Sequence, residues 1–357
     1  MIEAKIVADS SCNGHRLTSM VVTMPRFILA ELNTHRMLSR NSASSRAIPL
    51  KKMVDSVQNN PFIPIAWQKD HSGMQGTEYL TNPSFIEEAN RVWLDGRIYA
   101  VECASRLAIE HKLTKQLANR LLEPFMYHTV LISASEWENF FALRCPLYRI
   151  VGKKGEPYNP EFDFRSRKNL EKELGAPDIV VEAREKNTNE DLAWLSLNEG
   201  QAEIHMMALA EAMWDARNES TPKELQPGEW HIPFEDKIQY SVQDGEYTTY
   251  LPETLVKIAT AMCARVSYTV VGEEGKVPNY QNDIKLHDRL ATSGHWSPFE
   301  HCAKAMSKDE FEMHYSGKSS YLKAAEGIFP YEAYGWSGNF RGFIQYRKTF
   351  NNENITT

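Results

Sequence analysis

One stretch of the chain combines the residue types that bind anions. Residues 33–46, Asn-Thr-His-Arg-Met-Leu-Ser-Arg-Asn-Ser-Ala-Ser-Ser-Arg, hold three arginines and four serines. Arginine presents a planar fork of donors that suits a phosphate group, and serine and asparagine side chains can fill the remaining positions. The alternative is a solvated polar loop, which is what most segments rich in Arg and Ser form. We therefore treat residues 33–46 as a candidate anion site that needs support from the rest of the chain.

Two further arginines lie where helices are expected to be largely apolar. Arg120 ends the segment Gln-Leu-Ala-Asn-Arg, and Arg144 ends Glu-Trp-Glu-Asn-Phe-Phe-Ala-Leu-Arg. An arginine in apolar surroundings needs a partner or a ligand, because an unpaired charge is costly to bury. Both are candidate ligand contacts, and pairing with Glu123 or Glu136 explains them equally well.

The segment Gly-His-Trp-Ser-Pro-Phe-Glu-His, residues 294–301, predicts a helix start. Ser297 would be the N-cap, Pro298 the first helical residue, and Glu300 would complete a capping box. The free N–H groups of such a first turn can also bind an anion, here beside His295. Capping alone explains the serine, proline and glutamate, so both interpretations stay open.

Three more patterns complete the set of candidates. They are Gly-Gln-Ala-Glu-Ile at 200–204, Ala-Arg-Val-Ser-Tyr at 264–268, and a basic and aromatic segment at 338–348 that a surface strand would also explain. Common signatures for dinucleotides, phosphates, catalytic zinc and serine nucleophiles do not occur, and the His and Cys residues lack metal-ligand spacing. A dinucleotide could bind here only through a motif other than these common signatures. The chemistry would then come from a cofactor or from residues scattered along the sequence.

Composition limits the class of protein. The 357 residues are 42% hydrophobic and 24% charged, with a net charge of −7, so we expect neither a nucleic acid polymer nor a membrane as partner. The five cysteines are odd in number and scattered, which indicates a reducing compartment. No signal-peptide pattern or apolar span is found, so the expected location is the cytoplasm.

The elements that must position these residues are mostly helices. Alternation of β-branched residues predicts a strand over 16–24 that ends at Pro25, and residues 149–191 are expected to form an inserted loop or hairpin. Residues 53–79 are expected to be loop-rich, with a turn around 272–275 and a frayed end at 351–357. Periodicity predicts helices over 27–35, from Asn82-Pro83 to about 107, and over 112–123, 135–144, 199–217, 252–267 and 283–293.

A linker around 221–228 divides the chain into two parts. Residues 1–220 would carry the clusters around 33–46, Arg120, Arg144 and 200–204, and residues 221–357 would carry the later motifs and pack with the first part into one unit. The expected strand and the more numerous expected helices together indicate an α+β fold class in which helices dominate.

Together these clusters resemble the flavin-dependent thymidylate synthases. That family is marked by Arg-His-Arg-x7-Ser, and here Thr34-His35-Arg36 is followed by Ser44 at that spacing. The Glu-Trp…Leu-Arg, Ala-Gln-x-Glu-Ile, Ala-Arg-Val-Ser-Tyr and Gly-His-x-Ser-Pro-Phe-Glu-His motifs have counterparts at 136–144, 201–204, 264–268 and 294–301.

The chain also departs from the family pattern. The last two motifs follow the His-Arg motif instead of preceding it, so the chain resembles a circularly permuted form, similar to long phage-type members. Thr34 stands for an arginine, Glu31 for a glutamine and Ser42 for a glutamate.

The resemblance implies helices packed on an antiparallel sheet and reductive methylation of dUMP at carbon 5. The carbon donor would be methylenetetrahydrofolate, FAD would carry hydride, and NADPH would reduce it. Hydroxymethylation or methylation of another pyrimidine deoxynucleotide, or a non-catalytic nucleotide- or flavin-binding homologue, are the alternatives. A homo-oligomer is also implied, either a tetramer or a dimer.

The resemblance also implies residue roles, position by position. Ser44, Arg46, Arg120 and Arg144 would form the catalytic group, which binds the nucleotide together with Glu31 and Ser45. The flavin would lie against His35, Arg36, Ser39, Asn41, Ser267, His295, Ser297, Glu300, Asn339 and Arg341. Arg144 matches two family arginines, one that faces the nucleotide and one that faces the flavin.

Overall fold

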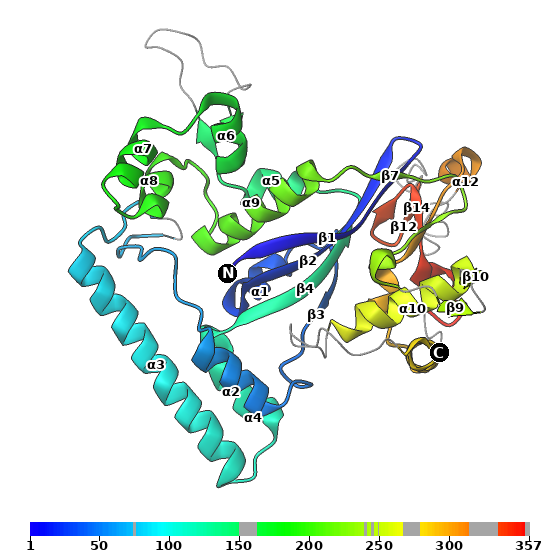
Figure 1. Cartoon of the computed structure of the whole chain (residues 1–357), viewed down its shortest axis with the longest axis horizontal. Helices are drawn as coiled ribbons and strands as arrows, with labels where there is room; N and C mark the ends of the chain where they lie inside the picture. The colour runs from blue at the N-terminus through cyan, green and yellow to red at the C-terminus, as the bar shows by residue number, and fades with distance from the viewer. Residues whose placement is uncertain are drawn as a thin grey trace, which may run out of the picture.

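The computed structural model describes residues 1–73, 76–149, 163–238, 241–243, 246–248, 250–266, 279–313 and 335–353. These residues form helices around mostly antiparallel sheets, which confirms the α+β class (Figure 1). Ser267 and the expected turn at 272–275 lie outside the described residues. Within the described part, no helix is both long enough and apolar enough to span a bilayer.

A five-stranded sheet with strand order β3-β4-β2-β1-β7 forms the centre. The β1–β2, β2–β4 and β3–β4 pairs are antiparallel and the β1–β7 pair is parallel. Asn13 and Gly14 both have positive φ, as the tight β1–β2 hairpin requires. Its strands are β1 (Glu3–Cys12), β2 (His15–Pro25), β3 (Ser39–Ser42), β4 (Tyr127–Ala134) and β7 (Lys223–Glu224). The strand predicted to end at Pro25 is confirmed.

One face of this sheet packs against three helices, α1 (Leu29–Leu32), α5 (Glu138–Arg144) and α9 (Ile204–Glu219) (Figure 1). Alternate residues of the strands and the inner side of α9 form the main core, including Met20, Val22, Val130, Ile132, Met206, Leu209 and Met213. Glu203 begins α9 by accepting bonds from two backbone N–H groups, so the helix starts later than expected. The helix predicted over 27–35 is wrong beyond Leu32, where turns begin.

The opposite face of the sheet is covered by the second part of the chain. Its central helix is α10 (Pro252–Arg265), and Cys263 of that helix packs near Leu131 of β4. The other elements of this part are β8 (Trp230–His231), η4 (Glu235–Lys237), β9 (Ser241–Gln243), β10 (Glu246–Thr248), α11 (Tyr280–Thr292), η5 (Ser297–Glu300), β11 (Ala303–Ala305), α12 (Lys308–Met313), β12 (Trp336–Ser337), β13 (Phe340–Arg341), β14 (Phe343–Gln345) and η7 (Tyr346–Thr349). The strands β14, β11 and β8 form a second sheet, and the helices expected over 252–267 and 283–293 are confirmed with shifted ends.

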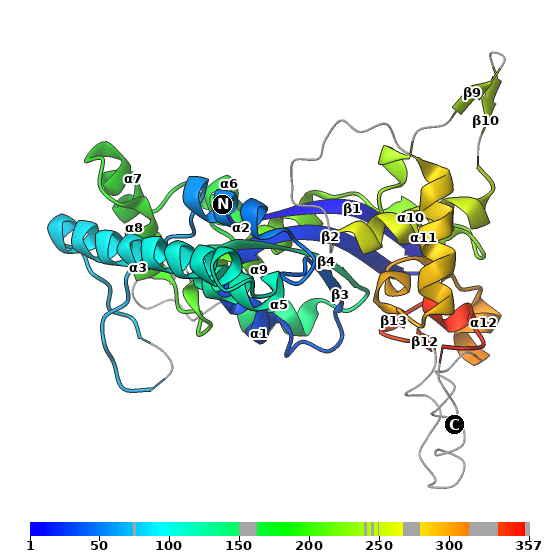
Figure 2. The same cartoon turned by 90° about the horizontal axis from the view of Figure 1, so that it is seen from below.

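The long helix α3 (Pro83–Ile109) lies at the far end from α10 and α11 in both views (Figures 1 and 2). Asn82 caps it, as the sequence predicted. It packs on α2 (Leu50–Asn59), α4 (Lys115–Ala118) and η2 (Asn119–Phe125), whereas η1 (Arg26–Ile28) leads into α1. The loop predicted over 53–79 is therefore wrong up to Asn59. The helix predicted over 112–123 is divided into α4 and a 3-10 helix that contains Pro124.

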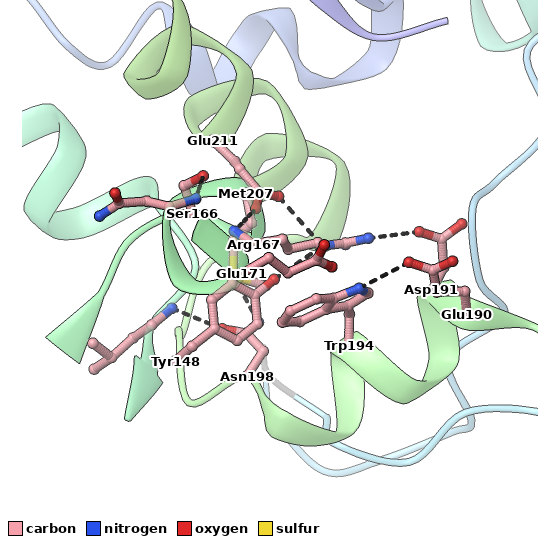
Figure 3. A network of polar contacts seen from close by, with 12 residues as sticks. Tyr148, Ser166, Arg167, Glu171, Glu190, Asp191, Trp194, Asn198, Met207 and Glu211 are labelled. Atoms are coloured by element: carbon pink, nitrogen blue, oxygen red, sulfur yellow. Dashed lines mark hydrogen bonds and ion pairs between the residues drawn. The ribbon is translucent and has the colours of Figure 1, made fainter. Parts of the chain in front are cut away.

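Residues 163–198 correct another expectation. From Arg167 onward they form the helices α6 (Arg167–Leu174), α7 (Asp178–Glu185) and α8 (Glu190–Leu197) in place of the loop or hairpin expected over 149–191, whereas the antiparallel pair of β6 (Asp163–Phe164) and β5 (Tyr148–Arg149) agrees with the hairpin. A separate small core that includes Trp194 holds them. Arg167 reaches the Tyr148 hydroxyl, Asp191 and Glu211 of α9, and so links these helices to the main body (Figure 3).

Candidate functional site

The segment that leads into β3 is folded by its own arginine. The Arg40 guanidinium donates to the backbone oxygens of Leu32, at 3.0 Å, and of His35, at 2.7 Å. These bonds close the turns after α1 and satisfy carbonyl groups that the short helix leaves without partners. Arg40 is thus a structural residue, whereas Arg36 and Arg46 point to solvent.

Strand β3 joins the two parts of the chain through its buried polar side chains. Ser39 and Asn41 are buried, because alternate residues of a strand share one face. Asn41 donates to the backbone oxygen of Cys263 at 2.6 Å. The Ser297 hydroxyl lies 3.2 Å from the Asn41 side-chain oxygen and 3.1 Å from the Arg40 backbone oxygen. Two predicted flavin residues, Asn41 and Ser297, are therefore in direct contact.

The expected capping box at Ser297 is wrong. Its segment forms η5, a single 3-10 turn without a side-chain cap, because the Ser297 hydroxyl contacts β3 instead. Glu300 forms an ion pair with Arg347, and burial raises the pKa of its carboxyl group although Arg347 opposes this shift. The interpretation of this segment as a helix start that binds an anion therefore loses its main physical basis.

The hairpin of β12 and β13 brings Asn339 to the Ser39 side chain. The Asn339 amide donates to the Arg36 backbone oxygen at 3.1 Å and to the Ser39 hydroxyl at 3.4 Å. Gln345, which the sequence did not single out, donates to the Ser39 hydroxyl and to the Glu300 backbone oxygen, each at 3.1 Å. Since Gln345 is 2% exposed, β14 is not the surface strand that was the alternative interpretation.

Other members of the predicted flavin set lie apart from these contacts. Arg341 is exposed and stacks over the Phe311 ring, with 5.7 Å between guanidinium carbon and ring centroid. His295 is also exposed, and its Nδ1 shares a hydrogen bond with the Ser293 hydroxyl at 2.9 Å. Neither side chain has a described contact to Ser39 or Asn41.

Part of the predicted nucleotide set lies beside Asn119, whereas Glu31 and Arg144 do not contact it. The buried Asn119 amide donates to the backbone oxygens of Ser45, at 2.6 Å, and of Ile48, at 3.0 Å. Arg46 follows Ser45 and Arg120 follows Asn119, so the hydrogen bond from Asn119 to Ser45 places the backbones of the two arginines near each other. Arg120 also pairs with Glu123 at 3.2 Å, which is one of the partners considered from the sequence.

Arg144 has partners in the segment before β3. It forms an ion pair with Glu31 and donates from Nε to Nε2 of His35 at 2.9 Å. His35 therefore accepts at Nε2, which requires the neutral ring. Burial lowers the pKa of His35, and the neighbouring Arg144 and Arg40 lower it further. Arg144 thus contacts His35, one of the residues predicted to bind the flavin. Its ion-pair partner is Glu31 and not Glu123 or Glu136, the partners considered from the sequence.

A row of buried serines and histidines runs beneath this site. The Ser133 hydroxyl shares hydrogen bonds with the Ser19 hydroxyl at 2.5 Å and with His301 Nδ1 at 2.8 Å. His231 continues the row from Ser19 at 2.8 Å. Burial lowers the pKa of both histidines to about 3, so they are neutral near pH 7. Since Ser133 also lies opposite Ser39 in the sheet, the row ends under the β3 contacts.

The described residues offer no obvious metal centre or thiolate nucleophile. Among them no group of three or more His, Cys, Asp or Glu side chains could hold a metal ion. Cys145 is buried, and desolvation raises the pKa of its thiol. A buried protonated thiol is a poor nucleophile.

Comparisons with known proteins find distant structural neighbours. No protein-family model and no curated protein sequence matches the chain. Two solved structures of a UMP/dUMP methylase, PolB from Streptomyces cacaoi, align at 14% identity. The structure with 5-Br dUMP has a TM-score of 0.31 over 53% of this chain and 74% of that chain. The one with 5-Br UMP has a TM-score of 0.32 over 57% and 97%.

Proposed function

We propose that this chain is a flavin-dependent thymidylate synthase that methylates dUMP at carbon 5. Methylenetetrahydrofolate would supply the carbon, and NADPH would reduce the FAD. One observation carries the proposal: segments around 39–41, 297–300 and 339–345, which resemble one family's motifs, meet through side-chain hydrogen bonds. About three hundred residues separate the first segment from the last, and a chance likeness of short motifs would not require them to meet.

The side chains around these contacts fit an FAD. Arg36, beside the Asn339 contact, is exposed and has no ion-pair partner among the described residues, so it is free to bind a phosphate group. Ser297 and Asn339 would orient the cofactor through a hydroxyl and an amide group, and the buried Ser39 and Asn41 would hold these two side chains in place. When bound, FAD would supply the hydride chemistry of the reaction.

The nucleotide would lie at the Asn119 contact. Arg46 and Arg120 can donate paired hydrogen bonds to a dianionic phosphate, with Ser44 and Ser45 beside them. When the phosphate binds, Arg120 would leave Glu123 and pair with the phosphate. Glu123 would remain paired with Arg26, whose guanidinium nitrogen lies 3.6 Å from its carboxylate. Arg144 is paired with Glu31 and bonded to His35, which favours a positioning role over direct contact with the phosphate.

The Glu31–Arg144 pair also favours a second candidate function. The family has glutamine where this chain has Glu31, and a carboxylate there neutralises the arginine. A changed charge beside the site would change which pyrimidine deoxynucleotide is bound, or would permit transfer of a hydroxymethyl group instead of a methyl group.

A turnover assay distinguishes these functions. Purified full-length protein is incubated with FAD, NADPH, methylenetetrahydrofolate and dUMP, and the nucleotide is analysed by mass spectrometry. A methyl-sized gain supports thymidylate synthesis, and an additional oxygen supports hydroxymethylation. Bound flavin and nucleotide without any product would refute both and would leave a binding protein. Arg46→Ala would then weaken binding with no rate to lose.

A further inference from the structure

Arg26 is a partly buried cation to which the proposed reaction gives no direct role. It lies in η1, which packs on η2, and its backbone N–H donates to the Met126 oxygen at 3.0 Å. The Arg26 side chain is 19% exposed, against 53% for the neighbouring Arg120. A guanidinium group with so little contact with water is costly to bury unless a negative charge compensates it.

Glu123 compensates only part of this charge. Its Oε1 lies 3.6 Å from Arg26 Nη2 and 3.2 Å from Arg120 Nη1, so two guanidinium groups share one carboxylate oxygen. Burial lowers the pKa of Arg26, Glu123 raises it, and the neighbouring Arg120 lowers it further. The Nε of Arg26 is buried and has no hydrogen-bond partner among the described residues. Arg26 therefore has charge and donors in excess of what Glu123 can accept.

His128, near Arg26, supplies no negative charge either. Burial and, to a smaller extent, the Arg26 charge lower the pKa of His128 to about 3, so its ring is neutral near pH 7. The Nε2 of His128 is also buried without a partner in the described part of the chain. Buried polar atoms in proteins nearly always have partners, so two without one in the same region indicate a ligand site.

More cations lie in the same region. The Nζ of Lys115 donates to the backbone oxygen of Ala47 at 2.8 Å, and Ala47 follows Arg46 in the chain. We call the group of Arg26, Arg46, Lys115 and Arg120 the cation cluster. The whole chain has a net charge of −7, yet within the described residues Glu123 is the carboxylate that forms ion pairs with this cluster. Such a local excess of positive charge attracts an anion that carries more than one charge.

We propose that Arg26 is a further phosphate ligand of the nucleotide site, together with Arg46 and Arg120. This inference rests on the proposed function, because it places a phosphate monoester at those two arginines. Arg26 would keep Glu123 on Nη2 and donate to the phosphate from its remaining N–H groups, since a guanidinium has five of them. A phosphate dianion has the charge and the oxygen atoms to accept from three arginines.

Glu123 then competes with the phosphate for Arg120. In the free protein its carboxylate oxygen lies between Arg26 and Arg120, which is also how two arginines bind one phosphate oxygen. The carboxylate and the phosphate have like charges and repel each other, so binding of the phosphate has to draw Arg120 away from Glu123. Removal of the Glu123 charge should therefore strengthen phosphate binding.

Calorimetry on the full-length protein, with dUMP and with deoxyuridine, tests the role of Arg26. Arg26→Gln should weaken dUMP binding by about 10-fold or more, because a charge-assisted contact is lost, and should leave deoxyuridine binding within about twofold. Arg26→Lys keeps the charge without the planar fork and should lie between wild type and Arg26→Gln. Glu123→Gln should strengthen dUMP binding by about threefold or more. The control Arg149→Gln removes an arginine that pairs with Asp163 and Glu199, outside the cation cluster, and should leave dUMP affinity unchanged.

The outcomes separate this inference from the proposed function. If Arg46→Ala weakens dUMP binding and Arg26→Gln does not, the inference is wrong and the nucleotide site stands. If neither variant changes dUMP binding, both are wrong. Weaker dUMP binding in Arg26→Gln without turnover in the wild type supports the phosphate site and refutes only the methylation.

A purely structural role of Arg26 gives a different result. An equal loss of dUMP and deoxyuridine affinity in Arg26→Gln would overturn the proposal. If Arg26→Gln does not fold, Arg26→Lys and Glu123→Gln decide, and unchanged dUMP affinity in both of them would overturn it.

Discussion

Arg144 Nε donates a hydrogen bond to Nε2 of His35 at 2.9 Å, and the same guanidinium is paired with Glu31. The bond sets the His35 ring as a neutral acceptor, and the ring is nearly perpendicular to Phe140 at a centroid distance of 4.9 Å. An ion pair on α1 and α5 thus orients the histidine of the segment that leads into β3. This relationship makes Glu31 a residue whose charge can be tested.

The first prediction concerns Glu31→Gln, which keeps the shape of the side chain and removes its charge. The pair is partly exposed, so the free energy of unfolding should fall by only about 1 kcal/mol, as measured in urea. Without the carboxylate, Arg144 becomes an unpaired cation and the affinity for an anionic nucleotide should rise. The matched control is Glu219→Gln on α9, whose carboxylate pairs with Lys168. An equal gain in nucleotide affinity from both variants would contradict a local effect.

The second prediction concerns Arg46, an exposed cation for which no ion pair is found among the described residues. Arg46→Ala should leave the free energy of unfolding within about 0.5 kcal/mol of wild type. It should weaken dUMP binding by about 10-fold or more in calorimetry, because a charge-assisted phosphate contact is lost. Lys172→Ala on α6 removes an equally exposed charge as a control. Unchanged dUMP affinity in Arg46→Ala would remove this residue from the nucleotide site.

The third prediction concerns Asn339. Asn339→Ala removes the bonds to Ser39 and to the Arg36 backbone, and should reduce FAD affinity by about 10-fold in a fluorescence titration. Asn352→Ala is a matched control, because Asn352 donates to the Ala291 backbone oxygen at 3.4 Å outside the site. A loss of FAD affinity in the control as large as in Asn339→Ala would show that the effect is not specific.

The fourth prediction concerns pH. Burial lowers the pKa of His128, His231 and His301 to about 3, against about 6.5 in an unfolded chain. Below about pH 6.5 the unfolded state binds more protons at these residues than the folded state does. Their contribution to stability is therefore complete above pH 6.5 and is lost as the pH falls towards 3, by about 1.4 kcal/mol per unit for each histidine.

Four carboxyl groups act in the opposite direction, those of Glu136, Asp215 and Glu300, whose pKa values are raised by burial, and that of Glu211. Burial raises the pKa of Glu211 to about 7, so between about pH 4.5 and 7 the folded state holds an extra proton there. Burial also lowers the pKa of His15, His35 and His287. Urea unfolding between pH 7 and 5 should therefore still show a fall in stability, because six histidines act against these four carboxyl groups. In Glu211→Gln the fall should become steeper. Stability that rises over this range would contradict the neutral state of the histidines.

Several local features were predictable from the sequence because their causes are local. Asn82-Pro83 starts α3 because its cap lies within two residues, and alternating β-branched residues form β2. The sequence also marked residues 33–46 and 294–301, and Asn41 and Ser297 within them are in contact. Motif spacing was enough to select these segments.

Other features depend on contacts between distant residues. Ser297 matches an N-cap locally, but β3 offers its hydroxyl better acceptors, so the capping box does not form. Residues 167–197 are highly charged, yet a small core around Trp194 makes them helical. Gln345 lies in the segment 338–348 that the sequence marked and His231 lies in none, but the role of each arises only where β14 and β8 meet the sheet.

The sequence by itself thus determined the α+β class and the start of the long helix, and it selected two segments, 33–46 and 294–301, that come into contact, because propensity and spacing act over a few residues. Only the tertiary structure decided which charges are paired. Arg40, Arg120 and Arg144 look alike in sequence, yet one closes a turn, one meets Glu123 and one meets Glu31 and His35. Pairing depends on distance in space, and the packing of the two parts of the chain on opposite faces of one sheet sets those distances.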